Sequence, residues 1–480
     1  MSKNTRDHIF LIFLLLIFVL PLRFLNLSYS ELSDDEKKAR IRGGDNLLEF
    51  FMEQRKGPVQ FLVTEITTSI TKDPRNEFSL RAPFTLFNIF SVIVCYFVVY
   101  RLIKSKPASF VTAFLFLTNG FITGFSRIAQ YQNLNLFFSL SALLFYSFLI
   151  DKDKKLYTFS LIGILFFCLS VLSHWDAVFY LIPMAYIFIK FLKRKNLSKE
   201  YKIRLIIYNF VLGCFLLLPF MIPYLASQLN NPDNIRYFGR RVGFEGIPLD
   251  RHLFIFKLYN PFITLYLYFG LSLLGILVFK KTWIYFIWAA VNFALIKFFM
   301  PKPGTHIYNY VIPVIFLSGI SSGLLVSKLK NILKKAAFSS VLVLMLPLFY
   351  QSYMLFVDHS VEYPWESKKV FNRQTQPYID EEVLTFGFPH FRNWKEINQI
   401  MLNDENSCGF YITNEGKEIS QIYVDIKYGI PENGCYYVIH VEKPFNNRGR
   451  DIVFAQVYRK GPIYKYKRGY TTYAKLYRKN

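Results

Sequence analysis

The sequence has few cysteines and lacks several short motifs that mark common soluble enzymes. Its five cysteines form no CxxC pair and show no Cys/His spacing typical of a metal site, so neither a redox dithiol nor a zinc finger is expected. A P-loop, a glycine-rich dinucleotide motif and HExxH are also absent from the 480 residues. Nucleotide hydrolysis and zinc proteolysis therefore have no support in the sequence.

Acidic residues are scarce as well. The 57 lysines and arginines outnumber 33 aspartates and glutamates, which gives a net charge of +24. A nucleic-acid-binding protein would need its basic residues on one soluble face. Many of these cations lie instead in short loops between apolar runs, which indicates membrane topology, and we expect no nucleic-acid partner.

Hydrophobic residues are abundant: they make up 53% of the chain, and 19% of the chain is aromatic. They cluster into runs of about 18 to 22 residues, long enough to cross a bilayer core of roughly 30 Å. We therefore predict a polytopic α-helical membrane protein with about eleven spans. The spans are expected at 9–27, 84–103, 109–125, 134–150, 156–173, 177–192, 205–229, 261–279, 282–299, 307–325 and 337–357.

The loops between these runs predict the orientation of the chain. The first run follows Lys3 and Arg6 and has no small-x-small cleavage site after it, so we interpret it as an uncleaved helix with a cytoplasmic N-terminus. Every inside loop then contains lysine, which is the positive-inside pattern. These loops are 104–108, 151–155, 193–204, 280–281 and 327–335. The same count places everything after about Phe356 outside the cytoplasm.

The C-terminal part differs in pattern from the rest. Alternating residues at 383–388, 409–413, 421–428, 435–441 and 451–458 predict strands, and 393–402 predicts a helix. We expect two parts, a transmembrane catalytic domain at 1–360 and a small extracytoplasmic α/β domain at 361–480. Cys408 and Cys435 could pair if this domain lies outside the cytoplasm, and the sequence leaves that pairing open.

The first outer loop, residues 28–83, contains the acidic cluster Ser33-Asp34-Asp35-Glu36. Carboxylates and cations held together at a membrane surface can support general-base chemistry on a phosphorylated substrate. The alternative is a solvated loop whose charges do nothing specific.

Three short outer segments carry unusual polar residues at helix ends. Arg127 lies close to Gln130, while His174 and Asp176 flank Trp175 in a short turn, and His306 leads into Tyr308. An ionisable residue at such a position is costly unless it is paired or faces water, so a function is favoured. The alternative for each is an interfacial anchor. The chemistry implied is transfer of a group from an anionic lipid, with arginine or lysine neutralising the phosphate.

This order of features resembles the GT-C superfamily of membrane glycosyltransferases, which use polyprenyl-phosphate sugars. More narrowly, it is similar to the dolichyl-phosphate-mannose–protein mannosyltransferases and the bacterial aminoarabinose transferase of lipid A. The matching elements are the acidic pair Asp35-Glu36, ambiguous by one residue because of Asp34, then Lys56-Gly57-Pro58-Val59, Arg81-Ala82-Pro83, Arg127 and His306-x-Tyr308. The second element departs from the family by Gly57 in place of a proline.

The resemblance implies roles for these residues. Asp35 would be the base that activates the acceptor, with Asp34 the runner-up and Glu36 a supporting carboxylate. The candidates for binding the donor phosphate are Lys56, Arg81, Arg127 and one of Arg236, Arg240 and Arg241. The substrate pocket would contain His174, Asp176, His306 and Tyr308. The implied partners are a polyprenyl-phosphate sugar donor, a lipid, glycan or protein acceptor, and membrane lipids.

The Trp-Trp-Asp-x-Gly signature of oligosaccharyltransferases is missing, which argues against N-glycan transfer from a pyrophosphate donor. Metal use stays open at the level of sequence: no decisive metal cluster is present, although Asp34, Asp35 and Glu36 could hold a divalent cation. The first alternative function is a transporter or flippase of a lipid-linked sugar, which should show inverted repeats and mid-membrane charges. The second is a non-catalytic scaffold.

Overall fold

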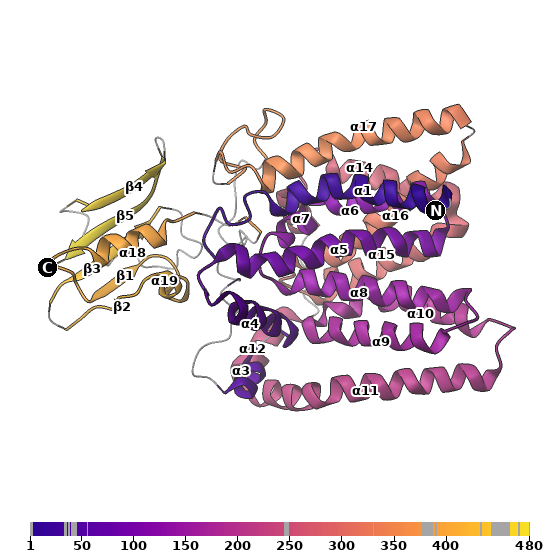
Figure 1. Cartoon of the computed structure of the whole chain (residues 1–480), viewed down its shortest axis with the longest axis horizontal. Helices are drawn as coiled ribbons and strands as arrows, with labels where there is room; N and C mark the ends of the chain where they lie inside the picture. The colour runs from indigo at the N-terminus through magenta and orange to yellow at the C-terminus, as the bar shows by residue number, and fades with distance from the viewer. Residues whose placement is uncertain are drawn as a thin grey trace.

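The chain forms a helical bundle followed by a small sheet domain (Figure 1). The computed structural model describes residues 3–480 except 33–35, 37–38, 40–45, 55, 244–248, 330, 362, 376–386, 389–390, 433, 443–460, 469–470 and 480. The helical part comprises α1 (Lys3–Phe24), α3 (Leu47–Glu53), α4 (Val59–Thr71), α5 (Glu77–Ile103), α6 (Lys106–Thr118), α7 (Gly120–Ser126), α8 (Tyr131–Ser147), η1 (Phe148–Ile150), α9 (Leu156–Ser173), η2 (Trp175–Tyr180), α10 (Leu181–Leu192), α11 (Lys199–Asn230), α12 (Pro232–Arg241), α13 (Leu249–Tyr259), α14 (Thr264–Leu273), η3 (Leu274–Val278), α15 (Phe279–Phe299), η4 (Gly304–Ile307), α16 (Tyr308–Lys328) and α17 (Asn331–Phe356).

The described residues contain nine helices long and apolar enough to cross a membrane, or up to ten if α6 and α7 count as one bent span. The sequence predicted about eleven. The difference lies at 264–299, which the sequence divided into two spans and which is one helical stretch through α14, η3 and α15. The bend of 61° between α6 and α7 falls at Asn119. Its side chain accepts a hydrogen bond from the Phe121 N–H and so starts a new helix there.

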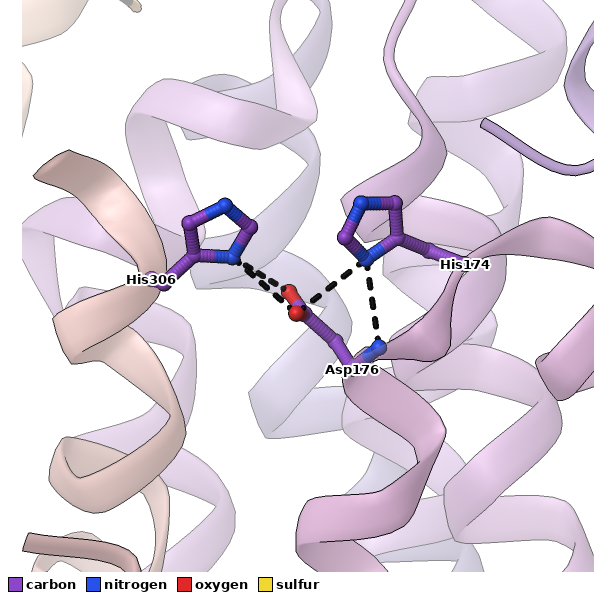
Figure 2. A group of neighbouring side chains, drawn as sticks. All are labelled: His174, Asp176 and His306. Carbon is purple, nitrogen blue, oxygen red and sulfur yellow. Dashed lines mark hydrogen bonds and ion pairs between the residues drawn. The ribbon is translucent and has the colours of Figure 1, made fainter. Parts of the chain in front are cut away.

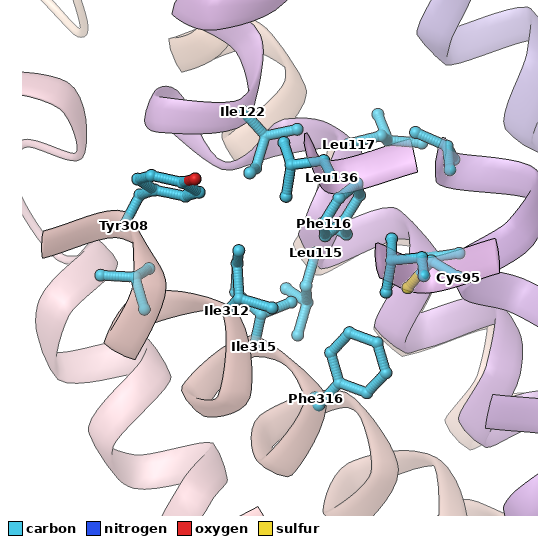
Figure 3. Packing of buried hydrophobic residues seen from close by; sticks show 14 of the residues in the cluster. Cys95, Leu115, Phe116, Leu117, Ile122, Leu136, Tyr308, Ile312, Ile315 and Phe316 are labelled. Carbon is cyan, nitrogen blue, oxygen red and sulfur yellow. The ribbon is translucent and has the colours of Figure 1, made fainter. Parts of the chain in front are cut away.

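Helices α8 and α16 form the centre of the bundle. The span that contains α16 is 78% buried and the one that contains α8 is 72% buried, against 17% for α11 at the edge (Figure 1). Small residues let α16 approach α6 closely: a Cβ on Gly319 would lie 2.4 Å from Cα of Thr112, and one on Gly323 would lie 2.3 Å from Cα of Ala108. Large apolar side chains of the same two helices belong to this core, among them Phe116 of α6 and Ile312 and Phe316 of α16 (Figure 3).

The described part of the C-terminal domain is a five-stranded sheet with two helices, and it lies at the end of the bundle where α5 begins (Figure 1). The strand order is β2-β1-β3-β5-β4, with β1 parallel to both neighbours and β5 antiparallel to both of its own. The elements are α18 (Trp394–Leu402), β1 (Phe410–Thr413), α19 (Lys417–Tyr423), β2 (Lys427–Tyr428), β3 (Tyr436–Val441), β4 (Tyr464–Arg468) and β5 (Thr471–Lys479). The strand predicted at 421–428 is wrong for its first half, because α19 continues to Tyr423 and only Lys427–Tyr428 pair as β2. The strand predicted at 451–458 and most of the one at 383–388 lie outside the described residues. A disulfide joins Cys408 and Cys435, so the pairing that the sequence left open is made.

Candidate functional site

The structure brings the four predicted pocket residues together at the end of the bundle that faces the C-terminal domain. Nδ1 of His306 lies 3.0 Å from Oδ1 and 3.1 Å from Oδ2 of Asp176 (Figure 2). The hydroxyl of Tyr308 donates a hydrogen bond of 2.9 Å to Oδ2 of the same carboxylate. Asp176 and Tyr308 are fully buried, and His174 is 5% exposed. A carboxylate without access to water is thus surrounded by side chains that can donate hydrogen bonds to it.

Local backbone geometry places these side chains. His174 follows the last residue of α9 in an extended conformation, and its Nδ1 accepts a hydrogen bond of 3.1 Å from the Asp176 N–H. The histidine therefore caps the start of η2. On the other side, Gly304 has a φ of 50°, a conformation that suits glycine, and it starts the turn of η4 that presents His306.

The two imidazoles are arranged alike around the carboxylate. Their ring centroids lie 5.4 Å apart and their planes are nearly parallel. Figure 2 shows that one nitrogen of each ring points to Asp176 and that the other nitrogen points away from it, both toward the same side. Asp176 thus orients two imidazole edges for contact with a third group.

A lysine and a tyrosine extend the cluster. The Tyr131 ring stacks on His174 with centroids 3.8 Å apart, and Nζ of Lys56 lies 5.2 Å from the centroid of Tyr131. Lys56 also donates a hydrogen bond of 2.7 Å to Oε1 of Gln130. The neighbouring Gly57 lets this loop lie directly on the end of α9, because a Cβ there would lie 1.8 Å from the carbonyl oxygen of Leu172. The departure from the family motif at this position therefore has a steric reason.

Burial sets the protonation of His174. Burial is the largest cause that lowers the pKa of this imidazole, Asp176 opposes the shift, and the resulting value is about 4. The ring is therefore neutral near pH 7. Nδ1 lies 3.1 Å from the backbone nitrogen of Asp176 and 3.1 Å from Oδ1 of its carboxylate, so Nε2 is the ring nitrogen that points away from Asp176.

The same residues fit a divalent cation. His174, Asp176 and His306 each offer one ligand atom, and these atoms lie within 4.8 Å of one another. Two imidazole nitrogens and a carboxylate oxygen are a donor set that zinc accepts in catalytic sites. The sequence had considered a cation at Asp34, Asp35 and Glu36. The structure describes only Glu36 of these, and its oxygens accept hydrogen bonds from the Arg81 guanidinium and from the Ala129 N–H.

Arg81 and Glu36 form a buried ion pair inside the first outer loop. Two guanidinium nitrogens of Arg81 donate to the Glu36 carboxylate, both at 2.8 Å. Its remaining hydrogen bonds go to the carbonyl oxygens of Leu27, Ser30 and Glu31. All five donors of the guanidinium are therefore used within the protein, which favours a positioning role for Arg81 over direct contact with a phosphate.

Arg127 is engaged in a similar way at the end of α1. Its guanidinium donates to four backbone carbonyl oxygens, at distances from 2.7 to 3.3 Å. These carbonyls belong to Leu22, Arg23, Leu25 and Asn26. A cation at this position satisfies the unpaired carbonyls of a helix C-terminus. Arg127 thus fixes the point where the chain leaves α1 for the first outer loop.

The remaining predicted residues lie outside the described part of the structure or on its surface. Asp34 and Asp35 lie outside the described residues. Arg240 and Arg241 lie in the last turn of α12, and their side chains lie outside the described part of the structure. Arg236 is exposed on the same helix. Among the described candidate cations, Lys56 is the one that contacts the cluster.

Sequence reasoning missed Tyr131 and Glu31. Tyr131 follows Gln130, which the sequence did single out, so an aromatic residue in the first turn of α8 was an available signal. Glu31 precedes the acidic cluster by two positions, yet nothing local separates it from a solvated acid. In the structure Glu31 is only 4% exposed, and its carboxylate accepts hydrogen bonds from two backbone N–H groups of the C-terminal domain.

Comparison with known proteins adds to this geometry. The family described as "Dolichyl-phosphate-mannose-protein mannosyltransferase" matches residues 55–224. ArnT from Cupriavidus metallidurans bound to undecaprenyl phosphate aligns with a TM-score of 0.56 and 11% identity, over 99% of this chain and 98% of that one. The chain has a GT-C fold. The predicted resemblance to that superfamily is confirmed, and so is the predicted class of polytopic helical membrane protein with a small C-terminal domain.

A second solved structure has the same fold in a longer chain. The archaeal oligosaccharyltransferase AglB from Archaeoglobus fulgidus, in complex with an inhibitory peptide and a dolichol-phosphate, aligns with a TM-score of 0.52 and 14% identity. The alignment covers 93% of this chain and 62% of that one. A comparison with the curated proteins found no match.

Proposed function

We propose that this chain is a membrane glycosyltransferase that takes a sugar from a polyprenyl-phosphate donor and transfers it to an acceptor outside the cytoplasm. The observation that carries the proposal is the buried Asp176 carboxylate, held by His306 and Tyr308 within a GT-C fold. Two imidazole edges and the Lys56 ammonium accompany this carboxylate, which is a set of groups suited to an anionic leaving group.

An apolar cavity suits the lipid part of such a donor. It has a volume of about 410 Å³ and lies among α13, α14, α15 and α16. Its lining is almost entirely aliphatic and aromatic, and it includes Tyr310, which lies one helical turn after His306. A branched isoprenoid chain fits an apolar lining of this kind, while the phosphate at its end would lie toward the polar cluster.

The reaction is a single displacement at the anomeric carbon. The acceptor hydroxyl oxygen forms a bond to that carbon, the bond from the carbon to the phosphate oxygen breaks, and polyprenyl phosphate leaves with the electron pair. The Lys56 ammonium would stabilise the charge that develops on this phosphate, with the outward-facing edge of the His174 ring beside it. The proton of the acceptor passes to a carboxylate.

We assign that carboxylate to Asp35, with Asp34 as the runner-up. The motif order in the sequence supports the assignment, and the described neighbours on both sides are held firmly. Leu32 donates its N–H to the Tyr423 hydroxyl at 2.8 Å, and Glu36 is paired with Arg81.

The C-terminal domain and the cluster would lie on the outer side. Lysine-containing loops at the opposite end of the bundle support this orientation. The Cys408–Cys435 disulfide supports it as well, because disulfides persist mainly in oxidising compartments.

The test is a transfer assay in proteoliposomes. Purified protein is given labelled mannosyl- or glucosyl-polyprenyl phosphate together with a membrane extract as the source of acceptor. We expect label in the extract, with loss of transfer in Asp35→Asn or Asp34→Asn. Movement of intact donor across the bilayer without release of polyprenyl phosphate would instead support the flippase alternative.

A further inference from the structure

Glu31 connects the first outer loop to the C-terminal domain. Its Oε2 accepts a hydrogen bond of 2.8 Å from the Arg392 N–H, and its Oε1 accepts one of 3.0 Å from the Trp394 N–H. The two donors lie more than 360 positions away in the sequence, on the other domain. The hydrogen bonds that this buried carboxylate needs are therefore donated by backbone N–H groups of the C-terminal domain.

These donors belong to the start of α18. Asn393 stands at the N-cap but has a left-handed conformation, and its side chain makes no capping hydrogen bond. Glu31 supplies the missing acceptor and places a negative charge at a helix N-terminus, where it is favourable. The guanidinium of Arg392 pairs with Glu415 at 2.5 Å, so Glu31 bonds the backbone of Arg392 while that side chain serves another carboxylate.

Leu32, the next residue, continues the connection. Its N–H donates to the Tyr423 hydroxyl at 2.8 Å, and its side chain is 1% exposed. It packs, with Leu80 of α5, into the hydrophobic core that contains Trp394 and Ile397 of α18. A residue of the first outer loop is thus part of the core of the C-terminal domain.

Two further ion pairs among the described residues join the C-terminal domain to the end of the first outer loop, near the start of α5 and well after the acidic cluster in the sequence. Lys395 pairs with Glu77 at 2.8 Å, and Arg75 pairs with Asp425. Arg75 and Asp425 are both substantially exposed, so their pair adds little to the binding of the two domains. It provides a matched control for the buried contacts of Glu31.

The opposite side of the acidic cluster is held by the helical bundle. Glu36 accepts from Arg81 and from the Ala129 N–H, and Arg81 also bonds the carbonyl oxygens of Leu27, Ser30 and Glu31. Glu31 and Leu32, before positions 33–35, are therefore bonded to the C-terminal domain, and Glu36, after them, is bonded to the helical bundle. Burying two acidic side chains is costly, and here the geometry of the bonds offsets that cost.

We propose that the C-terminal domain is part of the catalytic apparatus, and that Glu31 is a positioning residue through which it holds the first outer loop in register with the bundle. The proposal rests on the proposed glycosyltransferase function. It assigns the C-terminal domain a role in the turnover step, through the Glu31–α18 contact, that is separate from donor binding.

The experiment compares three variants of the full-length protein in the proteoliposome transfer assay. Glu31→Gln turns one carboxylate oxygen into an amide that cannot accept from a backbone N–H. Tyr423→Phe removes the acceptor for Leu32 with little change of shape. Asp425→Asn removes the exposed ion pair with Arg75 and keeps an amide oxygen that can still accept the hydrogen bond from Asn398.

We expect Glu31→Gln to lower kcat about tenfold or more with the KM for donor changed less than about twofold. Tyr423→Phe should lower kcat in the same direction by a smaller factor, and Asp425→Asn should retain kcat within about twofold. Wild-type kcat in both Glu31→Gln and Tyr423→Phe would overturn the proposal, as would an equal loss in all three variants.

Hydrogen exchange separates this outcome from a failure of the proposed function. Peptides covering residues 24–32 should exchange faster in Glu31→Gln and Tyr423→Phe than in wild type and Asp425→Asn. If wild type transfers no sugar, the proposed function fails, and unchanged exchange in these variants then also removes the positioning role. If Glu31→Gln fails to fold, the kcat and the hydrogen exchange of Tyr423→Phe, the milder change, decide the outcome.

Discussion

The hydroxyl of Tyr308 donates a hydrogen bond of 2.9 Å to Oδ2 of Asp176, and both side chains are fully buried. The two residues are 132 positions apart and come from different helical elements, η2 and α16. A buried carboxylate is stable only when such donors are aimed at it. Asp176 is therefore a fixed anion around which His174 and His306 are arranged.

Asp176→Asn should abolish the arrangement while keeping the size of the side chain. An amide in this position presents an NH2 group to one of the donors, so the imidazole edges lose their orientation. We expect transfer to fall at least about 100-fold. Tyr308→Phe should be milder, because it removes one charge-assisted hydrogen bond worth about 1.5–3 kcal/mol.

Both variants are checked by initial rates in the transfer assay and by thermal unfolding in detergent. Rates near wild type in Asp176→Asn would contradict a role for the cluster. A lost rate together with lost folded protein would point to a structural role alone.

Lys56→Gln should weaken donor binding. The ammonium lies over the Tyr131 ring beside the two imidazoles, and its loss removes a positive charge that a phosphate would face. We expect the Kd for undecaprenyl phosphate to rise about tenfold. The exposed Lys72→Gln is the matched control, since it also removes one lysine from the first outer loop. Equal affinity in both variants, measured by lipid-dependent thermal stabilisation, would argue against Lys56 as a phosphate ligand.

Arg81→Lys separates two roles for that residue. All N–H groups of the guanidinium donate to the Glu36 carboxylate or to carbonyl oxygens of the loop. A lysine ammonium cannot reproduce the planar, two-pronged geometry of these bonds. Breaking a buried pair of this kind typically costs about 3–5 kcal/mol. We therefore expect a large loss of stability, measured by thermal or denaturant unfolding. Normal stability with weakened undecaprenyl phosphate binding would instead support the phosphate contact that the motif order predicted.

Metal binding provides a separate test of the cluster. Because its three ligand atoms lie within 4.8 Å of one another, we expect the wild-type protein to retain up to about one zinc ion per chain. His306→Ala should lower the metal content measured by elemental analysis, and His252→Ala is the control, since His252 lies in the apolar cavity. Equal metal content in the two variants would show that the cluster holds no ion.

The Arg75–Asp425 pair predicts a pH dependence of the domain interface. The hydrogen bond from Arg75 lowers the pKa of Asp425 below its ordinary value, so the folded state favours the charged carboxylate. Its contribution is fully present above the unfolded pKa of about 3.9 and is lost as pH falls through the lower folded value. The difference in stability between wild type and Asp425→Asn should therefore be constant from about pH 5 to 7 and shrink below about pH 4. A difference that grows on acidification would contradict this sign.

The class of fold could be predicted from the sequence, because long apolar runs and lysine-containing loops are local signals. The sequence also identified His174, Asp176, His306 and Tyr308 as candidates. Ionisable groups near a membrane are costly unless they are paired or face water, so such residues at helix ends favour a function. Their mutual contact could not be read from the sequence, since spacing along the chain says nothing about which helices pack together.

The roles of the arginines illustrate the opposite case. Arg81 and Arg127 fit a phosphate-binding pattern, yet in the structure they bond backbone carbonyls of the loop and of the end of α1. Unpaired carbonyls leave no mark in a sequence, so such a use of arginine is invisible before the backbone is known. Glu31 was missed for the same reason, because its partners are the N–H groups of a distant helix.

The most direct measurement is the stoichiometry of transfer in proteoliposomes with a doubly labelled polyprenyl-phosphate sugar. The account predicts that wild-type protein releases polyprenyl phosphate and glycosylates the acceptor in equal amounts, and that Asp176→Asn does neither. Donor that crosses the bilayer intact, or equal turnover in wild type and Asp176→Asn, would contradict it.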